Sequence, residues 1–341
     1  MTGRTESYRV GLTADCAEPD GRTIFGDVGL ERLTAAGLVW EVMAPVVGHV
    51  PTADDLGRYD AVLSFGHLHF TRAVVTAAPR LKHVARFGAG YDGIDLDGLA
   101  DAGVVVTNTP LAVRRPLALA AMTLVLALGH RLVENHVAAT GGRWTDRGSH
   151  RGAGVAGRTI GILGLGGVGS DLARLLASLG VRVISNDRPG SQEAAAELGV
   201  ELVDIDRLAA ESDYVVVTAA LTESSYHLVD EQFLAAMKPS AYLVNVARGA
   251  LVDQAALTAA LRAGGIAGAG LDVLEHEPPS ADEPLLAMAN VIVTPHALCW
   301  TDDFTGGVAT SVVEAIIDVA QGRRPEHVLN PRAVQRLRLG D

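Results

Sequence analysis

The chain has 341 residues, of which 48% are hydrophobic and 20% charged, and its formal net charge is −12 at pH 7. Because this length exceeds what one hydrophobic core normally serves, two domains are expected, and the acidic balance argues against nucleic acid or an anionic membrane as a partner. The two cysteines, Cys16 and Cys299, lie far apart without metal-ligand spacing, which favours a reduced, cytoplasmic protein with no metal site.

The chain begins with MTGRTESYRV, which lacks the apolar run of a secretory signal. From residue 8 to about 108, short apolar runs alternate with helical stretches such as 28–36 and 71–78. This alternation predicts βαβ units and a parallel sheet whose strands are covered on both faces. The expected strands are 8–13, 38–43, 60–65, 82–87 and 103–108.

A helical pattern follows from about Pro116 to Ala138, with Pro116 in its first turn. Its most apolar part, residues 117–129, is too short to cross a bilayer and predicts a buried helix. A polar, glycine-rich segment then leads into a second series of strands. The expected strands are 159–163, 182–187, 214–220, 241–247, 268–273 and 290–296. A last helix is expected from about Asp303 to Ala320, followed by a polar and partly extended tail.

The order of these segments predicts that one α/β domain is interrupted by another. The chain builds a first domain, crosses by a helix into a second, and returns through the helix near residue 303. We therefore predict two parallel-sheet α/β domains of Rossmann-like and flavodoxin-like type. Residues 1–112 with 301–341 form the substrate-binding domain, and the inserted residues 113–300 form the nucleotide-binding domain.

A glycine-rich turn marks the expected dinucleotide site. Gly164, Gly166 and Gly169 form G-x-G-x-x-G between a strand and a helix, which is the context in which this motif binds a pyrophosphate. Asp187 ends the next strand and is expected to accept hydrogen bonds from ribose hydroxyls. Its charge would repel a 2′-phosphate, which favours NAD, although Arg188 beside it leaves NADP open.

Three later segments place polar side chains at the ends of apolar runs, namely LVNVARGALVD, AGLDVLEHEPP and VIVTPHALCW. Together with GLGGVG and the earlier RFGAGYDGIDL, in this order, they resemble the D-isomer-specific 2-hydroxyacid dehydrogenase family over about residues 60–331. The resemblance implies an NAD-dependent enzyme that interconverts a small 2-oxo acid and its D-2-hydroxy acid.

The resemblance also assigns the chemistry to three side chains. Arg248 would hold the substrate carboxylate and polarise its 2-oxo group, which suits the planar guanidinium fork. His296 would be the general acid/base, and Glu277 would orient it and stabilise its protonated form. Glu275 is the alternative carboxylate, but the family spacing favours Glu277, five residues after Asp272.

Further contacts are implied on both domains. The backbone N–H groups of Ala89 and Gly90 would grip the substrate carboxylate, so that the substrate bridges the two domains. His67 or His69 either contacts the distal group of the substrate or is an ordinary polar loop residue, and Trp300 either lines the pocket or packs in a core. The remaining implied cofactor contacts are Gly167, Val168, Ala219, Val246 and Asp272.

Several positions depart from the family pattern and bear on the subclass. Gly167 stands where an arginine is frequent, and Ala220 where a proline is usual. The loop at 64–70 has no lysine or arginine, which argues against a phosphorylated substrate, and Glu277 replaces the glutamine of formate dehydrogenases.

Two other functions stay open. Phosphite dehydrogenases share the Arg–Glu–His set, and NADH-sensing regulators similar to transcriptional corepressors are built on the same fold. The helix from Pro116 and the stretch around Trp144 match the region where family members pair, so we expect a homodimer.

Overall fold

The computed structural model describes residues 7–66 and 68–340, which divide into two compact units. Unit 1 consists of Met1–Val113 and Trp300–Asp341, and unit 2 of Arg114–Cys299. The expected domain limits, 1–112 with 301–341 and 113–300, lie one residue from these. Unit 2 is therefore an insertion in the chain of unit 1.

Unit 1 is built on a five-stranded parallel sheet with the order β2-β1-β3-β4-β5. This is the 2-1-3-4-5 order of flavodoxin-like folds. All five strands lie within the predicted runs, since apolar residues continue along them without alternation. The strands are β1 (Arg9–Leu12), β2 (Val39–Val42), β3 (Ala61–Ser64), β4 (His83–Arg86) and β5 (Val105–Thr107).

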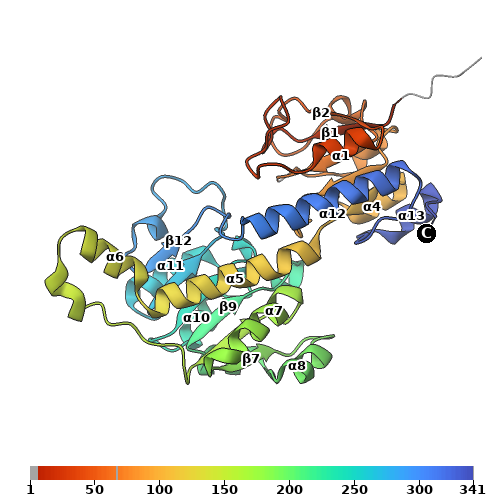
Figure 1. Ribbon diagram of the computed structural model, residues 1–341. Helices are drawn as coiled ribbons and strands as arrows, with labels where there is room; N and C mark the ends of the chain where they lie inside the picture. The colour runs from red at the N-terminus through yellow and green to blue at the C-terminus, as the bar shows by residue number, and fades with distance from the viewer. Residues whose placement is uncertain (1–6, 67, 341) are drawn as a thin grey trace, which may run out of the picture. The chain divides into compact units, whose positions relative to one another are not determined.

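Helices cover both faces of this sheet, as Figure 1 shows. One face is packed by helices that bury Leu56, Val75 and Leu99, and on the other the long helix α12 packs on β4 and α1. The helices are α1 (Leu30–Ala35), α2 (Ala53–Leu56), α3 (Arg72–Thr76), α4 (Leu96–Ala102), α12 (Asp302–Ala320) and α13 (Pro331–Leu337).

Helix α13 corrects the expectation of a partly extended tail. It starts at Pro331, whose fixed φ suits a first helical turn. Ala333 and Val334 are buried against β5 and α4. Its two turns are too short to show a clear helical period in the sequence.

Unit 2 is built on a seven-stranded parallel sheet with the order β12-β11-β10-β9-β6-β7-β8. The strand order reverses between β6 and β9, which is where dinucleotides bind in Rossmann folds. The strands are β6 (Thr159–Leu163), β7 (Arg182–Asn186), β8 (Glu201–Val203), β9 (Tyr214–Val217), β10 (Tyr242–Asn245), β11 (Gly268–Leu271) and β12 (Val291–Val293). The sequence did not predict β8, a three-residue edge strand.

Helices α9, α10 and α11 bury one face of this sheet, and α5, α7 and α8 bury the other. The doubly wound α/β class predicted from the sequence is therefore confirmed for both units. The helices are α5 (Pro110–Gly129), α6 (Leu132–Thr140), α7 (Gly167–Leu176), α8 (Gln192–Leu198), α9 (Ile205–Glu211), α10 (Glu231–Ala236) and α11 (Gln254–Ala263). Short 3₁₀ turns are η1 (Trp144–Gly148), η2 (Ala177–Leu179), η3 (Glu223–Ser225), η4 (Gly249–Leu251) and η5 (Pro284–Ala287).

The prediction of one helix from Pro116 to Ala138 was wrong in two ways. Helix α5 begins six residues earlier at Pro110, so Pro116 lies inside it. It ends at Gly129, whose carbonyl accepts a hydrogen bond from Ala153 N at 2.8 Å. The segment at Ala153 thus satisfies a carbonyl at the end of the helix. Helix α6 starts after Arg131, which has a φ of 50°.

Helix α5 is, among the described residues, long and apolar enough to span a membrane by length and composition. Its side chains instead contribute to the core of unit 2. Ala118, Leu124, Val125 and Leu128 are buried with residues of β6 and α7. The packing therefore agrees with the predicted buried helix.

Candidate active site

The glycine-rich turn lies at the carboxyl end of β6, at the strand-order reversal. Gly164 has a φ of 104°, and a Cβ built there would lie 2.6 Å from Ala219 Cα. A Cβ at Gly169 would lie 2.3 Å from the Gly164 carbonyl oxygen, so the helix packs directly on the turn. In contrast, a Cβ at Gly166 would meet no atom within 4 Å. The turn therefore packs closely at Gly164 and Gly169 but leaves open space at Gly166. This open space at the start of α7 fits a pyrophosphate.

Side chains from neighbouring strands fix this turn. Asn186 Oδ1 accepts from Gly164 N at 2.9 Å, and Thr218 Oγ1 donates to the Gly164 carbonyl at 2.8 Å. Asp187, next to Asn186, is exposed at the end of β7 and accepts from Gln192 Nε2 at 2.7 Å. Asp187 therefore directly follows the residue that contacts the glycine turn. Of the other expected cofactor residues, Ala219 and Val246 are buried at the ends of β9 and β10, and Val168 is half-buried in α7.

Arg248 follows β10 on a loop that is fixed by its own backbone contacts. Asn245 Nδ2 donates to the Arg248 carbonyl at 2.8 Å, and Asn245 Oδ1 accepts from Ala247 N at 3.0 Å. The guanidinium Nη1 donates to the Ala247 carbonyl at 2.7 Å. The charged group is thus half-buried at the carboxyl edge of the sheet.

His296 and Glu277 form a close pair in unit 2. His296 Nδ1 lies 2.7 Å from Glu277 Oε2, and the other carboxylate oxygen accepts from Leu274 N at 2.9 Å. Their side chains are 31% and 29% exposed, so solvent and ligands reach them. A carboxylate in this position fixes the orientation of the ring.

Asp272 holds the turn that carries His296, a role that the sequence did not predict. Its side chain is only 1% exposed, and Oδ1 accepts from Thr294 Oγ1 at 2.6 Å and from Ala297 N and Leu298 N at 3.1 Å each. The Asp272 carbonyl also accepts from His296 N at 2.8 Å. Asp272 therefore shapes the turn in which His296 takes a φ of 54°.

The loops of Arg248 and Glu277 touch through their backbones. A Cβ at Gly249 would lie 1.9 Å from the Leu274 carbonyl oxygen and 2.4 Å from Glu275 N. No side chain fits between them. This contact places the loop that carries the arginine directly against the loop that carries the carboxylate.

Glu275 belongs to a second histidine–carboxylate pair. Its Oε1 lies 2.9 Å from His227 Nε2, and its Oε2 accepts from Gln254 N at 3.3 Å. Gln254 Oε1 accepts in turn from Glu275 N at 2.8 Å. No motif or spacing in the sequence marks this pair, because its members are 48 residues apart. The structure therefore separates the two candidate carboxylates: Glu277 contacts His296, and Glu275 contacts His227.

In unit 1, the loop after β4 carries Ala89 and Gly90. Asn108 Nδ2 donates to the Ala89 carbonyl at 2.7 Å, and Gly88 is tied to Thr109 by two hydrogen bonds. The N–H groups of Ala89 and Gly90 donate to no residue in the described parts of the chain. They are thus available to an anion, as their predicted role requires.

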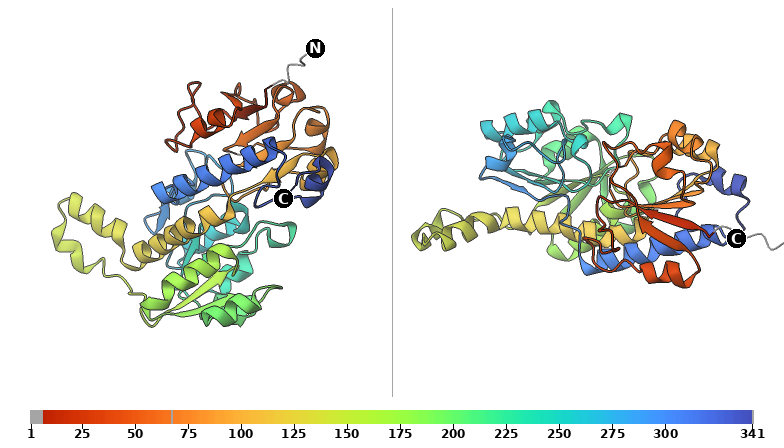
Figure 2. Two further views of the ribbon diagram at one scale, coloured as in Figure 1. Left: turned by 45° about the vertical axis from the view of Figure 1, so that its right-hand side comes forward. Right: turned by 90° about the horizontal axis from the view of Figure 1, so that it is seen from above.

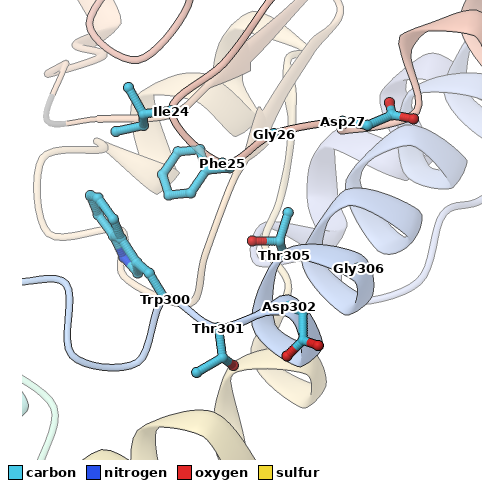
Figure 3. Close-up of a pocket in the computed structure, with 9 residues that line it drawn as sticks. All are labelled: Ile24, Phe25, Gly26, Asp27, Trp300, Thr301, Asp302, Thr305 and Gly306. Atoms are coloured by element: carbon cyan, nitrogen blue, oxygen red, sulfur yellow. The ribbon is translucent and has the colours of Figure 1, made fainter.

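Trp300 lies in an aromatic cluster of unit 1. Its ring is 4.7 Å from that of Phe25, which also contacts Phe65 and Phe87. Trp300 and Phe25 line a cavity of about 580 Å³, together with Asp27 and Asp302. Figure 3 shows these residues. Of the two histidines expected to contact the distal group, His67 lies outside the described residues. The ring of His69 lies 6.1 Å from that of His49, and His69 N donates to the His49 carbonyl at 2.6 Å.

The Cys299 thiol is a poor candidate for the reaction. Burial raises the pKa of the Cys299 thiol to about 12, so it stays protonated at neutral pH and is a poor nucleophile. Within residues 7–66 and 68–340, no group of three or more histidine, cysteine, aspartate or glutamate side chains could hold a metal ion.

Comparison with known proteins adds independent information. The D-isomer specific 2-hydroxyacid dehydrogenase NAD-binding domain matches residues 122–297. A glyoxylate reductase from Thermococcus onnurineus is 40% identical over 277 residues, covering 80% of this chain and 83% of that protein.

Solved structures show the same architecture over nearly the whole chain. The TT0316 protein from Thermus thermophilus has a TM-score of 0.83 at 31% identity, covering 94% of this chain and 99% of that one. An NADPH-dependent glyoxylate/hydroxypyruvate reductase from Sinorhizobium meliloti, solved with NADP and malonate, has a TM-score of 0.80 at 29% identity, covering 96% and 98%. The protein therefore belongs to the D-isomer-specific 2-hydroxyacid dehydrogenase family and is a nicotinamide-dependent 2-hydroxyacid oxidoreductase.

Proposed function

We propose that this enzyme reduces a small, unphosphorylated 2-oxo acid, such as glyoxylate or hydroxypyruvate, to the D-2-hydroxy acid with NADH. One observation carries the proposal: Glu277, which lies 2.7 Å from His296, stands on a loop in backbone contact with the loop of Arg248. A proton donor and a carboxylate anchor are thus fixed against each other. The glyoxylate reductase named above supports the choice of acid.

The nicotinamide, when bound, supplies the hydride for reduction and accepts it in the reverse direction. Arg248 binds the substrate carboxylate through its planar fork and draws electron density from the adjacent 2-oxo group. This holds the carbonyl carbon in a fixed position and makes it more electrophilic.

His296 provides the proton that the carbonyl oxygen needs as the alcohol forms. Since Nδ1 faces Glu277, the proton exchanged with substrate is the one on Nε2. Glu277 holds the ring in place and stabilises the imidazolium before transfer. In oxidation the neutral ring takes the hydroxyl proton by the same route.

Unit 1 contributes the second carboxylate contact in this proposal. The N–H groups of Ala89 and Gly90 suit an oxyanion, because they form adjacent donors on a loop that Asn108 holds in place.

The lining of unit 1 favours an unphosphorylated substrate. Trp300 follows His296 by four residues in the sequence, and its cavity contains aromatic rings and the carboxylates of Asp27 and Asp302. Neither lysine nor arginine is among the residues that line it. This cavity therefore offers no cationic side chain to a phosphate.

We also propose that NAD is preferred over NADP. Asp187 presents its carboxylate at the end of β7, where the ribose hydroxyls bind in this fold. The Sinorhizobium meliloti reductase, in contrast, is NADPH-dependent. Asp187→Ala should raise kcat/KM with NADPH relative to NADH, because it removes the repulsion of a 2′-phosphate.

Unit 2 carries a protruding arm that fits a homodimer contact. Figures 1 and 2 show α6 and the turn after it extending away from the rest of unit 2. Leu132, Val133 and Val137 are exposed on it, and Trp144 is 71% exposed. We propose that a second copy of the chain covers these apolar side chains, a common arrangement in symmetric oligomers. Light scattering should give twice the chain mass of 35.5 kDa, and a single-chain mass would refute the dimer.

The test of the activity follows NADH absorbance with a panel of acids. Glyoxylate and hydroxypyruvate should be reduced faster than pyruvate, phenylpyruvate or 3-phosphohydroxypyruvate, and faster with NADH than with NADPH. If every acid failed while NADH still bound, oxidation of phosphite with NAD would be measured next. Failure of both would favour an NADH-sensing regulator.

A further inference from the structure

The start of α7 has an arginine beside it that does not come from the fingerprint. Gly167 is the first residue of α7 and is exposed. A Cβ built at Gly167 would lie 2.4 Å from Arg114 Nε and 2.9 Å from Arg114 Cδ. The side chain of Arg114, from α5, thus occupies the space that a side chain at position 167 would fill.

The backbone of Gly167 does not itself require glycine. Its φ lies outside the left-handed region, and the three nearest atoms to the built Cβ all belong to the side chain of Arg114. Glycine at position 167 therefore leaves the space that the side chain of Arg114 occupies.

Arg114 and its neighbour Arg115 differ in their partners. Arg115 Nε lies 3.4 Å from Asp171 Oδ2 on α7. Arg114 makes no hydrogen bond or ion pair with any residue that the structure describes, and it is exposed. An unpaired guanidinium is thus kept beside the open glycine turn, while the adjacent arginine is neutralised.

The surroundings favour an anion at this place. Gly166 leaves open space in front of the turn, and the first N–H groups of the ten-residue helix α7 carry partial positive charge. The nearest acid on α7, Asp171, is already shared by Arg115 and Arg174. A diphosphate would therefore find helix N–H groups and a guanidinium together.

We propose that Arg114 binds the pyrophosphate of the dinucleotide, in place of the arginine that the fingerprint lacks at position 167. The guanidinium reaches the glycine turn from α5 and forms charge-assisted hydrogen bonds to the phosphate oxygens. This inference rests on the nicotinamide cofactor of the family and not on the substrate proposed above.

The experiment measures the Kd of NADH by fluorescence titration without any oxo acid, so it is independent of which acid the enzyme reduces. Arg114→Ala should weaken binding about tenfold, the size expected for one exposed charge-assisted contact. Competition by ADP-ribose should weaken equally, whereas competition by adenosine, which has no phosphate, should not change.

Two further variants sharpen the test. Arg115→Ala is the matched control, since Arg115 is also an exposed arginine on the same turn of α5, and its NADH Kd should stay within about twofold of wild type. In the double variant R114A/G167R, the space vacated by Arg114 admits an arginine at 167, and NADH binding should recover to within about threefold.

The proposal is overturned if Arg114→Ala binds NADH and ADP-ribose as tightly as Arg115→Ala. It is equally overturned if the double variant binds no better than Arg114→Ala alone while both keep the wild-type melting temperature. In that case the loss would reflect something other than a missing phosphate contact.

Discussion

Glu275 and Glu277 stand on one short loop of unit 2, and each pairs with a histidine from another segment. The two pairs differ in what surrounds each ring. His227 has carboxylates on both sides, with Glu275 2.9 Å from Nε2 and Asp253 3.8 Å from Nδ1. Its ring also stacks on Tyr226 at 4.0 Å. His296 instead directs Nδ1 at Glu277 and sits in a turn shaped by Asp272.

The difference shows how the same residue types serve two purposes. A histidine enclosed by two carboxylates and a stacked ring ties loops together, because each contact restrains its position. A histidine oriented through one nitrogen can exchange a proton at the other. Both take left-handed backbone conformations, with φ of 50° and 54°, so backbone geometry does not distinguish them; the partners do.

The largest expected effect comes from removing each ring in turn. His296→Asn should lower kcat for reduction by about 10²–10⁴-fold, the usual contribution of general acid catalysis. The Kd of NADH should change little. His227→Asn should cost less than about tenfold in kcat. Steady-state kinetics on both variants measures this, and equal losses would show that the comparison is mistaken.

The next effect concerns the carboxylate beside His296. Glu277→Gln keeps the shape of the side chain but removes the charge that stabilises the imidazolium. We expect kcat for reduction to fall about 10–100-fold. The reverse oxidation, which needs the neutral ring as base, should fall less. A variant that slowed both directions equally would indicate a purely geometric role for Glu277.

A third histidine, His83, contacts a hydroxyl group in place of a carboxylate. His83 is fully buried on β4, with Nε2 2.8 Å from Thr107 Oγ1, and burial lowers its pKa to about 3. Between about pH 6.5 and 3 the unfolded chain therefore binds a proton that the folded chain does not, so stability falls as the pH falls through this window.

From pH 7.5 to 5, the contribution of His83 to this loss is roughly 2 kcal/mol. Urea unfolding at the two pH values measures it. His83→Gln, which does not titrate, should be less stable at pH 7.5 yet lose less on acidification. A loss of the same size in the variant would assign the effect to other groups.

The smallest effect is expected at Glu275. Both of its carboxylate oxygens accept hydrogen bonds, whereas an amide has one acceptor oxygen. Glu275→Gln should therefore lower the free energy of unfolding by about 1 kcal/mol and leave kcat within about threefold. Melting temperature and kinetics on the same preparation test this, and a large fall in kcat with unchanged stability would give Glu275 a direct part in the reaction.

The sequence predicted those features that depend on local pattern. Continuous apolar runs marked eleven of the twelve strands, since both sheets are covered on both faces. The glycine turn could be placed because its residues are neighbours in the chain. The short edge strand β8, the two turns of α13 and the end of α5 at Gly129 were missed, since tertiary contacts determine them.

In the candidate site, too, the sequence predicted what depends on local spacing and missed the contacts between distant segments. Family spacing selected Glu277, and the structure indeed brings it to His296. The pairing of Glu275 with His227 and the approach of Arg114 to Gly167 both join distant segments. Neither leaves a periodic or spacing signal, so only the fold reveals them.

The close backbone contact at Gly249 has a consequence for how this enzyme can change. A residue larger than glycine would push the Leu274 segment away and carry Glu277 with it. The loop of Arg248 and the loop of Glu277 are therefore coupled, and a substitution at Gly249 would disturb both. Directed evolution toward new acids should therefore leave Gly249 unchanged.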